Sequence, residues 1–145
     1  MRGAVIASAA AVALGVGIYA ASAFLMGDRA GAARIALGRT VYDANCAACH
    51  GAKLEGQPDW QTPLPSGRLP APPHDATGHT WHHPDELLLA IIRFGTAAVI
   101  GNGYQSDMPG FEGKLTADEM TAVLDYIKST WPEREAAMQR KVSGR

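Results

Sequence analysis

The sequence predicts an all-α protein of three to four helices, preceded by an N-terminal transmembrane helix or signal segment. Apolar residues recur with helical spacing in three stretches, residues 32–44, 85–94 and 117–130. Between the first two, residues 51–83 contain six prolines and show no helical or strand period. Because such a long loop is unusual in a compact domain, we expect it to wrap a bound group rather than to span empty space.

The bound group is indicated by the run Cys46-Ala47-Ala48-Cys49-His50. A C-x-x-C-H motif is typical of covalent haem attachment, with a thioether from each cysteine and the histidine as a ligand of the iron. A thioredoxin-like dithiol would follow a strand, whereas a helix is predicted before Cys46. The chain has no other cysteine, which excludes a disulfide scaffold and a four-thiolate metal site. We therefore predict one haem c, held by Cys46 and Cys49, with His50 on the iron.

Composition supports this interpretation and excludes some partners. The formal net charge is −1, so nothing indicates nucleic acid. Aromatic residues make up only 7% of the chain, which is few for a domain with its own dry core. A large apolar prosthetic group would fill part of that deficit.

Each predicted helix has recognisable features. In the first, Gly38 lies four residues before Tyr42, and Tyr42 lies four before Cys46, so the three share a face on which another element can approach closely. The second begins after Pro84, with acidic residues in its first turn, and ends at Gly95. The third begins with a capping box at Thr116 and ends at Trp131-Pro132. We expect residues 132–145 to form a charged C-terminal tail.

The N-terminal segment is apolar and has no charged residue from Gly3 to Gly27. About 20 apolar residues suffice to cross a bilayer, so we predict that residues 1–27 are a membrane anchor, followed by a hinge over residues 28–34. Ala21-Ser22-Ala23 is an alternative cleavage site, which would release a soluble periplasmic protein. The positive-inside count does not favour an outward orientation. We nevertheless place the haem domain in the periplasm, at the bacterial inner membrane, because this type of haem attachment takes place outside the cytoplasm.

From Ile35 to Trp131 the chain resembles a class I cytochrome c. The features that carry the resemblance are the haem motif, Gly38 and Tyr42 before it, a late Met108-Pro109, and Val123 and Tyr126 in the last helix. The resemblance implies the class I cytochrome c fold, in which the first and last helices cross at Gly38 with Tyr42, Val123 and Tyr126 around the crossing. The run from Gly78 to His83 is similar to small membrane-anchored bacterial cytochromes with one haem.

The second axial ligand is predicted to be Met108. Of the five methionines, Met1 and Met26 belong to the membrane segment, Met120 to a helix face and Met138 to the tail. Met108 remains, in a glycine-rich loop long enough to fold over a haem. Ligation by histidine and methionine raises the potential of the iron. The alternative ligands are His74, His79, His82 and His83.

Further cofactor contacts are expected from two side chains. Trp81 is a candidate donor to a haem propionate and Arg93 a candidate charge partner, since a buried propionate needs compensation. His74, His79, His82 and His83 are expected to edge the haem crevice, to cap the helix after Pro84 or to bond propionates. His79, His82 and His83 are also a candidate secondary metal site, because imidazole binds copper, zinc and iron.

The sequence thus leads us to expect a membrane-tethered electron carrier, not an enzyme, that passes single electrons between respiratory-chain donors and an acceptor such as a terminal oxidase. It would meet these redox partners transiently, attach to the membrane through residues 3–27, and take no small-molecule substrate. Two alternatives stay open: a protein that assists copper delivery through residues 74–83, and a haem enzyme with a displaceable distal ligand.

Overall fold

The computed structural model describes residues 25–144 and divides the chain into two compact units, residues 1–33 and 34–145. In the first unit, residues 25–33 are helical and exposed. The predicted hinge at residues 28–34 is helical instead, which fits the alanines that surround its glycine. Residues 3–24 of the predicted membrane segment lie outside the described residues. In the part of the chain that is described, no helix has the length and apolar character needed to cross a membrane.

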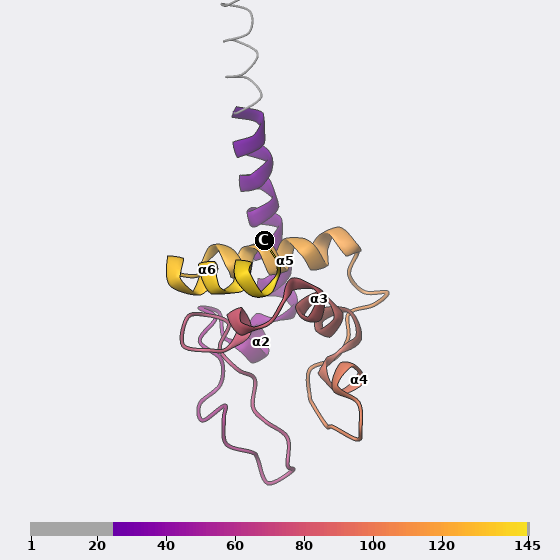
Figure 1. The fold of residues 1–145 in the computed structure, drawn as a ribbon. Helices are drawn as coiled ribbons and strands as arrows, with labels where there is room; N and C mark the ends of the chain where they lie inside the picture. Colours follow the sequence, from indigo (N-terminus) through magenta and orange to yellow (C-terminus); the bar gives the residue numbers. More distant parts are fainter. Residues whose placement is uncertain (1–24, 145) are drawn as a thin grey trace, which may run out of the picture. The chain divides into compact units, whose positions relative to one another are not determined.

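The second unit is built from helices and long loops (Figure 1). A helix over residues 34–45 leads through a turn at Cys46 into α2 (Ala47–His50). A 3-10 turn, η1 (Thr80–His82), precedes α3 (Asp85–Phe94) and α4 (Thr96–Ile100). The chain then forms α5 (Ala117–Ser129) and α6 (Glu133–Val142). Residues 25–144 contain isolated β-bridges but no strand, so the all-helical prediction is confirmed for them.

The helix boundaries follow the predicted signals. Helix α3 has acidic residues in its first turn, and Gly95 ends it with φ 84°. Helix α5 begins with a reciprocal capping box, in which the side chains of Thr116 and Glu119 each accept a bond from the other's backbone N–H. Helix α4 lies within a region that we predict as a loop. The helix was not predicted because a stretch of five small and apolar residues is too short to show a helical period.

The core lies where the helix over residues 34–45 packs against α5. Its buried cluster is made of Val41, Tyr42, Leu54, Val123, Ile127 and Trp131. Gly38 is buried at the crossing, where its neighbours are the backbone of Ala122 and the side chain of Tyr126. The crossing of the first and last helices at Gly38, which the resemblance implies, is therefore present.

Helix α6 differs from the charged tail that we predict. Its residue Gln139 is only 1% exposed, and Glu135 is also buried. The Gln139 amide donates to the carboxylate of Asp85, and the Nζ of Lys128 lies 2.7 Å from the same carboxylate. A buried polar network therefore attaches α6 to the start of α3 and to α5. The sequence did not indicate this packing, because most residues of α6 are charged or polar.

Candidate haem-binding site

The attachment motif lies at the junction between the helix over residues 34–45 and α2. The Cys46 N–H donates to the carbonyl of Tyr42 (2.8 Å), and the His50 N–H donates to the carbonyl of Cys46 (2.9 Å). Cys46 is half-buried, Cys49 is exposed, and both are free thiols. Burial, assisted by the neighbouring Cys49, raises the pKa of Cys46 to about 11, so this thiol is protonated at neutral pH. The motif thus presents two thiols one helical turn apart.

His50 is held in a single tautomer. Its Nδ1 lies 2.9 Å from the carbonyl oxygen of Pro72. Because a carbonyl can only accept, Nδ1 must carry the proton and Nε2 keeps its lone pair. Burial lowers the pKa of His50, although the bond to Pro72 partly opposes this effect, so the ring is neutral at neutral pH. A hydrogen bond from the ring nitrogen that does not bind the metal orients a metal-binding histidine and raises its basicity.

Met108 lies in a loop whose backbone is fastened to the end of α3. The N–H groups of Phe111 and Glu112 donate to the carbonyls of Ile92 (3.0 Å) and Arg93 (2.9 Å). Gly110 packs so closely on α3 that an added Cβ would lie 2.6 Å from the carbonyl carbon of Phe94. These contacts fix the exit of the loop, and the half-buried Met108 sits just before it.

The sulfur of Met108 has a polar neighbour that the sequence did not indicate. The Thr96 hydroxyl donates to Sδ across 3.4 Å. Thr96 is the first residue of α4, so the unpredicted helix places this hydroxyl at the loop that carries Met108.

The proline-rich segment and the Met108 loop extend from the same side of the helices in Figure 1. An ion pair between Arg68 and Asp107, the residue before Met108, joins them. The Gly56 N–H donates to the carbonyl of His50 (2.8 Å), which fastens the start of the proline-rich segment to the motif. The proline-rich segment is thus tied both to the Met108 loop and to the C-x-x-C-H motif.

Three of the four histidines of residues 74–83 stack on other rings, and the His79 ring also meets the His83 ring edge to face, with centroids 5.3 Å apart. The His74 ring stacks on His50, with centroids 4.0 Å apart. The His79 ring stacks on Trp60 (5.1 Å), and the His82 ring stacks on Trp81 (3.7 Å). Among residues 25–144, no group of three or more His, Cys, Asp or Glu side chains is placed to hold a metal ion. The structure therefore does not assemble His79, His82 and His83 into the candidate secondary metal site.

The two predicted propionate contacts have different surroundings. Arg93 is exposed and occupied, since its Nε and Nη2 both donate to Oε1 of Glu112 (2.9 and 2.6 Å). The indole Nε1 of Trp81 is buried and has no acceptor among the described residues, as is also true of Nε of Arg68 and Nδ1 of His79. A buried donor without an acceptor is costly, so the N–H groups of Trp81 and Arg68 are suited to an anionic ligand. Trp81 stays a candidate, and Arg68 joins it.

These residues fit a covalently bound haem. The motif offers two thiols, His50 offers a free Nε2 and Met108 a thioether, which are the donors that a c-type haem requires. The unsatisfied N–H groups suit its carboxylates. The proline-rich segment and the region from the end of α3 to the Met108 loop also expose large apolar side chains, namely Leu64, Leu69, Phe94, Ile100 and Tyr104.

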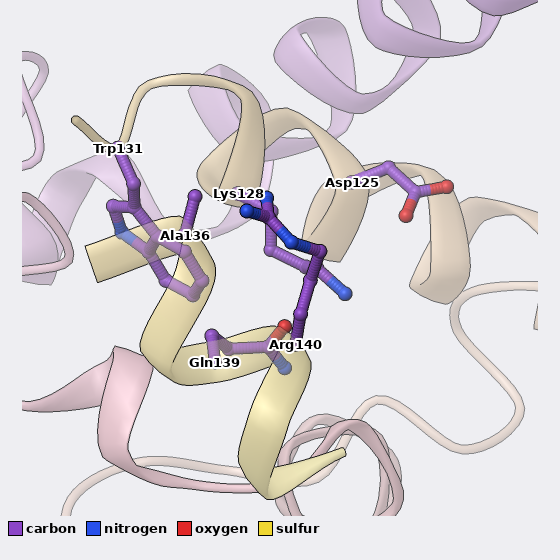
Figure 2. Close-up of a pocket in the computed structure, with 6 residues that line it drawn as sticks. All are labelled: Asp125, Lys128, Trp131, Ala136, Gln139 and Arg140. Atoms are coloured by element: carbon purple, nitrogen blue, oxygen red, sulfur yellow. The ribbon is translucent and has the colours of Figure 1, made fainter. Parts of the chain in front are cut away.

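A separate cavity of about 270 Å³ lies between α5 and α6 (Figure 2). It is lined by Asp125, Lys128, Trp131, Ala136, Gln139 and Arg140. None of the predicted haem contacts lines it. Lys128 and Gln139 belong to the network around Asp85, so this cavity borders a structural contact and not the haem site.

The fold and the motif together define an all-α protein of the c-type haem class. The chain belongs to the cytochrome c family, whose model, described as "Cytochrome c", matches residues 35–131. The chain is 31% identical over 110 residues to cytochrome c6 of Synechocystis sp., an alignment that covers 76% of this chain and 77% of that protein. It is 49% identical over 39 residues to cytochrome c-555 of Prosthecochloris aestuarii, covering 23% of this chain and 39% of that one. No solved structure matches the chain.

Proposed function

We propose that this protein is an electron carrier with one covalent haem, attached through Cys46 and Cys49 and ligated axially by His50 and Met108. The observation that carries the proposal is the bond from Nδ1 of His50 to the carbonyl of Pro72 at 2.9 Å. This bond leaves the lone pair of Nε2 free to bind iron, on the residue that directly follows Cys49. Membership of the cytochrome c family supports the same assignment.

The bound haem iron would supply the chemistry, by accepting and releasing one electron. The chain's own residues would keep the reorganisation around the iron small. The fastened exit of the Met108 loop and the Arg68–Asp107 ion pair restrain the segments on either side of the haem. Ligation on both faces leaves no position for a small-molecule substrate, which is why we propose a carrier and not an enzyme.

The finer assignments extend this proposal. We propose that residues 1–27 tether the protein to the bacterial inner membrane, that residues 35–131 form the haem domain in the periplasm, and that the electron acceptor is a partner such as a terminal oxidase. The uncharged sequence from Gly3 to Gly27 supports the tether. Membrane fractionation of the full chain against a chain that begins at Asp28 tests it: the full chain should resist carbonate extraction, and equal extraction of both would contradict the tether.

The carrier proposal is tested on the protein matured with covalent haem. We expect one haem per chain that survives denaturing electrophoresis, a reversible one-electron redox titration, and no rapid binding of carbon monoxide by the reduced form. The variant Cys46→Ala/Cys49→Ala should lose the covalent haem. Rapid binding of carbon monoxide would reveal an open iron position and would contradict the carrier in favour of a haem enzyme.

A further inference from the structure

The ring of His74 lies flat against the ring of His50. Their centroids are 4.0 Å apart and their planes are inclined by only 21°. Aromatic rings prefer offset-stacked or edge-to-face arrangements, and this pair is close to parallel. The second histidine therefore covers one face of the proposed iron ligand, while the carbonyl of Pro72 holds its edge.

His74 is itself fixed in place from several directions. Its Nδ1 lies 2.9 Å from the hydroxyl of Thr80, a side chain that is only 6% exposed. Its backbone N–H donates to the carbonyl of Leu54 (2.8 Å), and its carbonyl accepts a bond from the indole of Trp131 (2.7 Å). The edge of Tyr42 also faces it, with centroids 6.3 Å apart. A ring restrained in this way acts as a rigid surface for the ring beside it.

We infer that His74 is a positioning residue for the axial ligand, which fixes the orientation of the His50 imidazole and lowers the haem's reduction potential. The inference rests on the proposed function, in which His50 binds the iron through Nε2. Rotation of His50 about its bond to the iron would bring its ring into the face of His74. The stack therefore restricts that rotation, which the single bond to Pro72 does not prevent alone.

The direction of the effect on the potential follows from the charge of the rings. An imidazole bound to ferric iron carries more positive charge than one bound to ferrous iron. The face of an aromatic ring is its negative region, so the neutral ring of His74 stabilises the more positive state of His50. Contacts with the side chain that binds the iron are one of the means by which a protein adjusts a haem potential. Removal of the ring should thus favour ferrous iron and raise the potential.

The same contact excludes His74 as the alternative sixth ligand. Its ring lies against His50, on the side of the protein where the proposed fifth ligand is held, so it would not reach the opposite face of a haem bound by His50. A ring in this place acts on the iron through His50.

The test measures the potential and the NMR spectrum of the oxidised holoprotein, in which the hyperfine shifts of the haem methyl groups report the orientation of the axial histidine. We expect His74→Leu to raise the potential and to change the order or spread of the methyl shifts. Thr80→Val keeps the shape of the side chain but removes the hydroxyl that holds His74, and it should produce smaller changes in the same direction. Thr80→Ser keeps the hydroxyl and should resemble the wild type.

Two results would overturn the inference. One is a His74→Leu protein that retains its haem and has the potential and methyl shifts of the wild type. The other result applies if His74→Leu takes up no haem. In that case, a Thr80→Val protein with the same potential and methyl shifts as Thr80→Ser would overturn the inference. A failure of the proposed function looks different, because His50→Ala would then keep the wild-type haem spectrum.

Discussion

Gly38 packs directly on the backbone of Ala122, where the helix over residues 34–45 crosses α5. A Cβ added at Gly38 would lie 2.6 Å from the carbonyl carbon of Ala122 and 2.8 Å from the Cβ of Tyr126. On the same helix, the Tyr42 ring packs on Tyr126, and its hydroxyl donates to the carbonyl of Gly51 (2.9 Å). The buried Tyr42 therefore connects the helix crossing to the end of the C-x-x-C-H motif.

Replacing Gly38 by alanine should destabilise the protein. Overpacking of a core commonly costs about 1–3 kcal/mol, and here the neighbouring atoms are backbone, so we expect about 3 kcal/mol or more. Guanidinium unfolding of the holoprotein measures the loss. Gly31→Ala is the matched control, because nothing lies within 4 Å of that position and alanine is the better helix former. Equal stability of the two variants would contradict the close crossing.

The network around Asp85 should contribute strongly to stability. Nζ of Lys128 lies 2.7 and 2.8 Å from the two carboxylate oxygens, and both side chains are largely buried. Lys128→Met would remove the ammonium group that lies against this carboxylate. Breaking a fully buried pair costs about 3–5 kcal/mol, and since this pair is partly exposed we expect about 2 kcal/mol. The measurement is the unfolding free energy, with Lys141→Met on the exposed side of α6 as the control. A loss no larger than that of the control would show that the pair is unimportant.

Stability should fall as the pH drops below about 6.5, the ordinary pKa of an unfolded histidine. Burial lowers the pKa of His74, His79 and His83, with the neighbouring imidazoles adding to the effect. The unfolded chain therefore binds protons at a pH where the folded chain does not. The contribution is complete above the unfolded pKa and is lost as the pH falls toward the folded values. The loss is up to about 1.4 kcal/mol per pH unit for His74, the most deeply buried of the three, and smaller for His79 and His83, which solvent screens.

Guanidinium unfolding of the holoprotein between pH 7.5 and 5 measures this dependence. A His79→Gln variant removes one of the groups and should show a weaker dependence on pH. Stability that stays constant or increases on acidification of the wild type would contradict the neutral, buried state of these rings.

Local signals in the sequence predicted much of the fold. The capping box at Thr116, the acidic first turn after Pro84 and the Gly95 stop mark helix ends through contacts within a few residues, and all are present. Gly38 indicated a close approach because it stands on the same helix face as Tyr42 and Cys46. The resemblance to cytochromes c then indicated that the last helix is the element that packs against Gly38.

Contacts that depend on the path of a long loop could not be predicted. The proline-rich segment has no periodicity, so nothing indicated that the Pro72 carbonyl would reach Nδ1 of His50 or that His74 would stack on it. The density of histidines suggested metal binding, whereas the structure places His79 and His82 against different tryptophans. Arg93 looked available for a propionate because its partner, Glu112, lies in a loop that only the fold brings alongside α3.

Ligation of the iron by His50 and Met108 is tested most directly by the weak near-infrared band that a methionine sulfur on ferric haem iron produces. We predict this band in the oxidised wild-type protein at neutral pH, its loss together with a lower potential in Met108→Ala, and its retention in the control Met138→Leu. Absence of the band from the wild type, or its persistence in Met108→Ala, would contradict ligation of the iron by His50 and Met108.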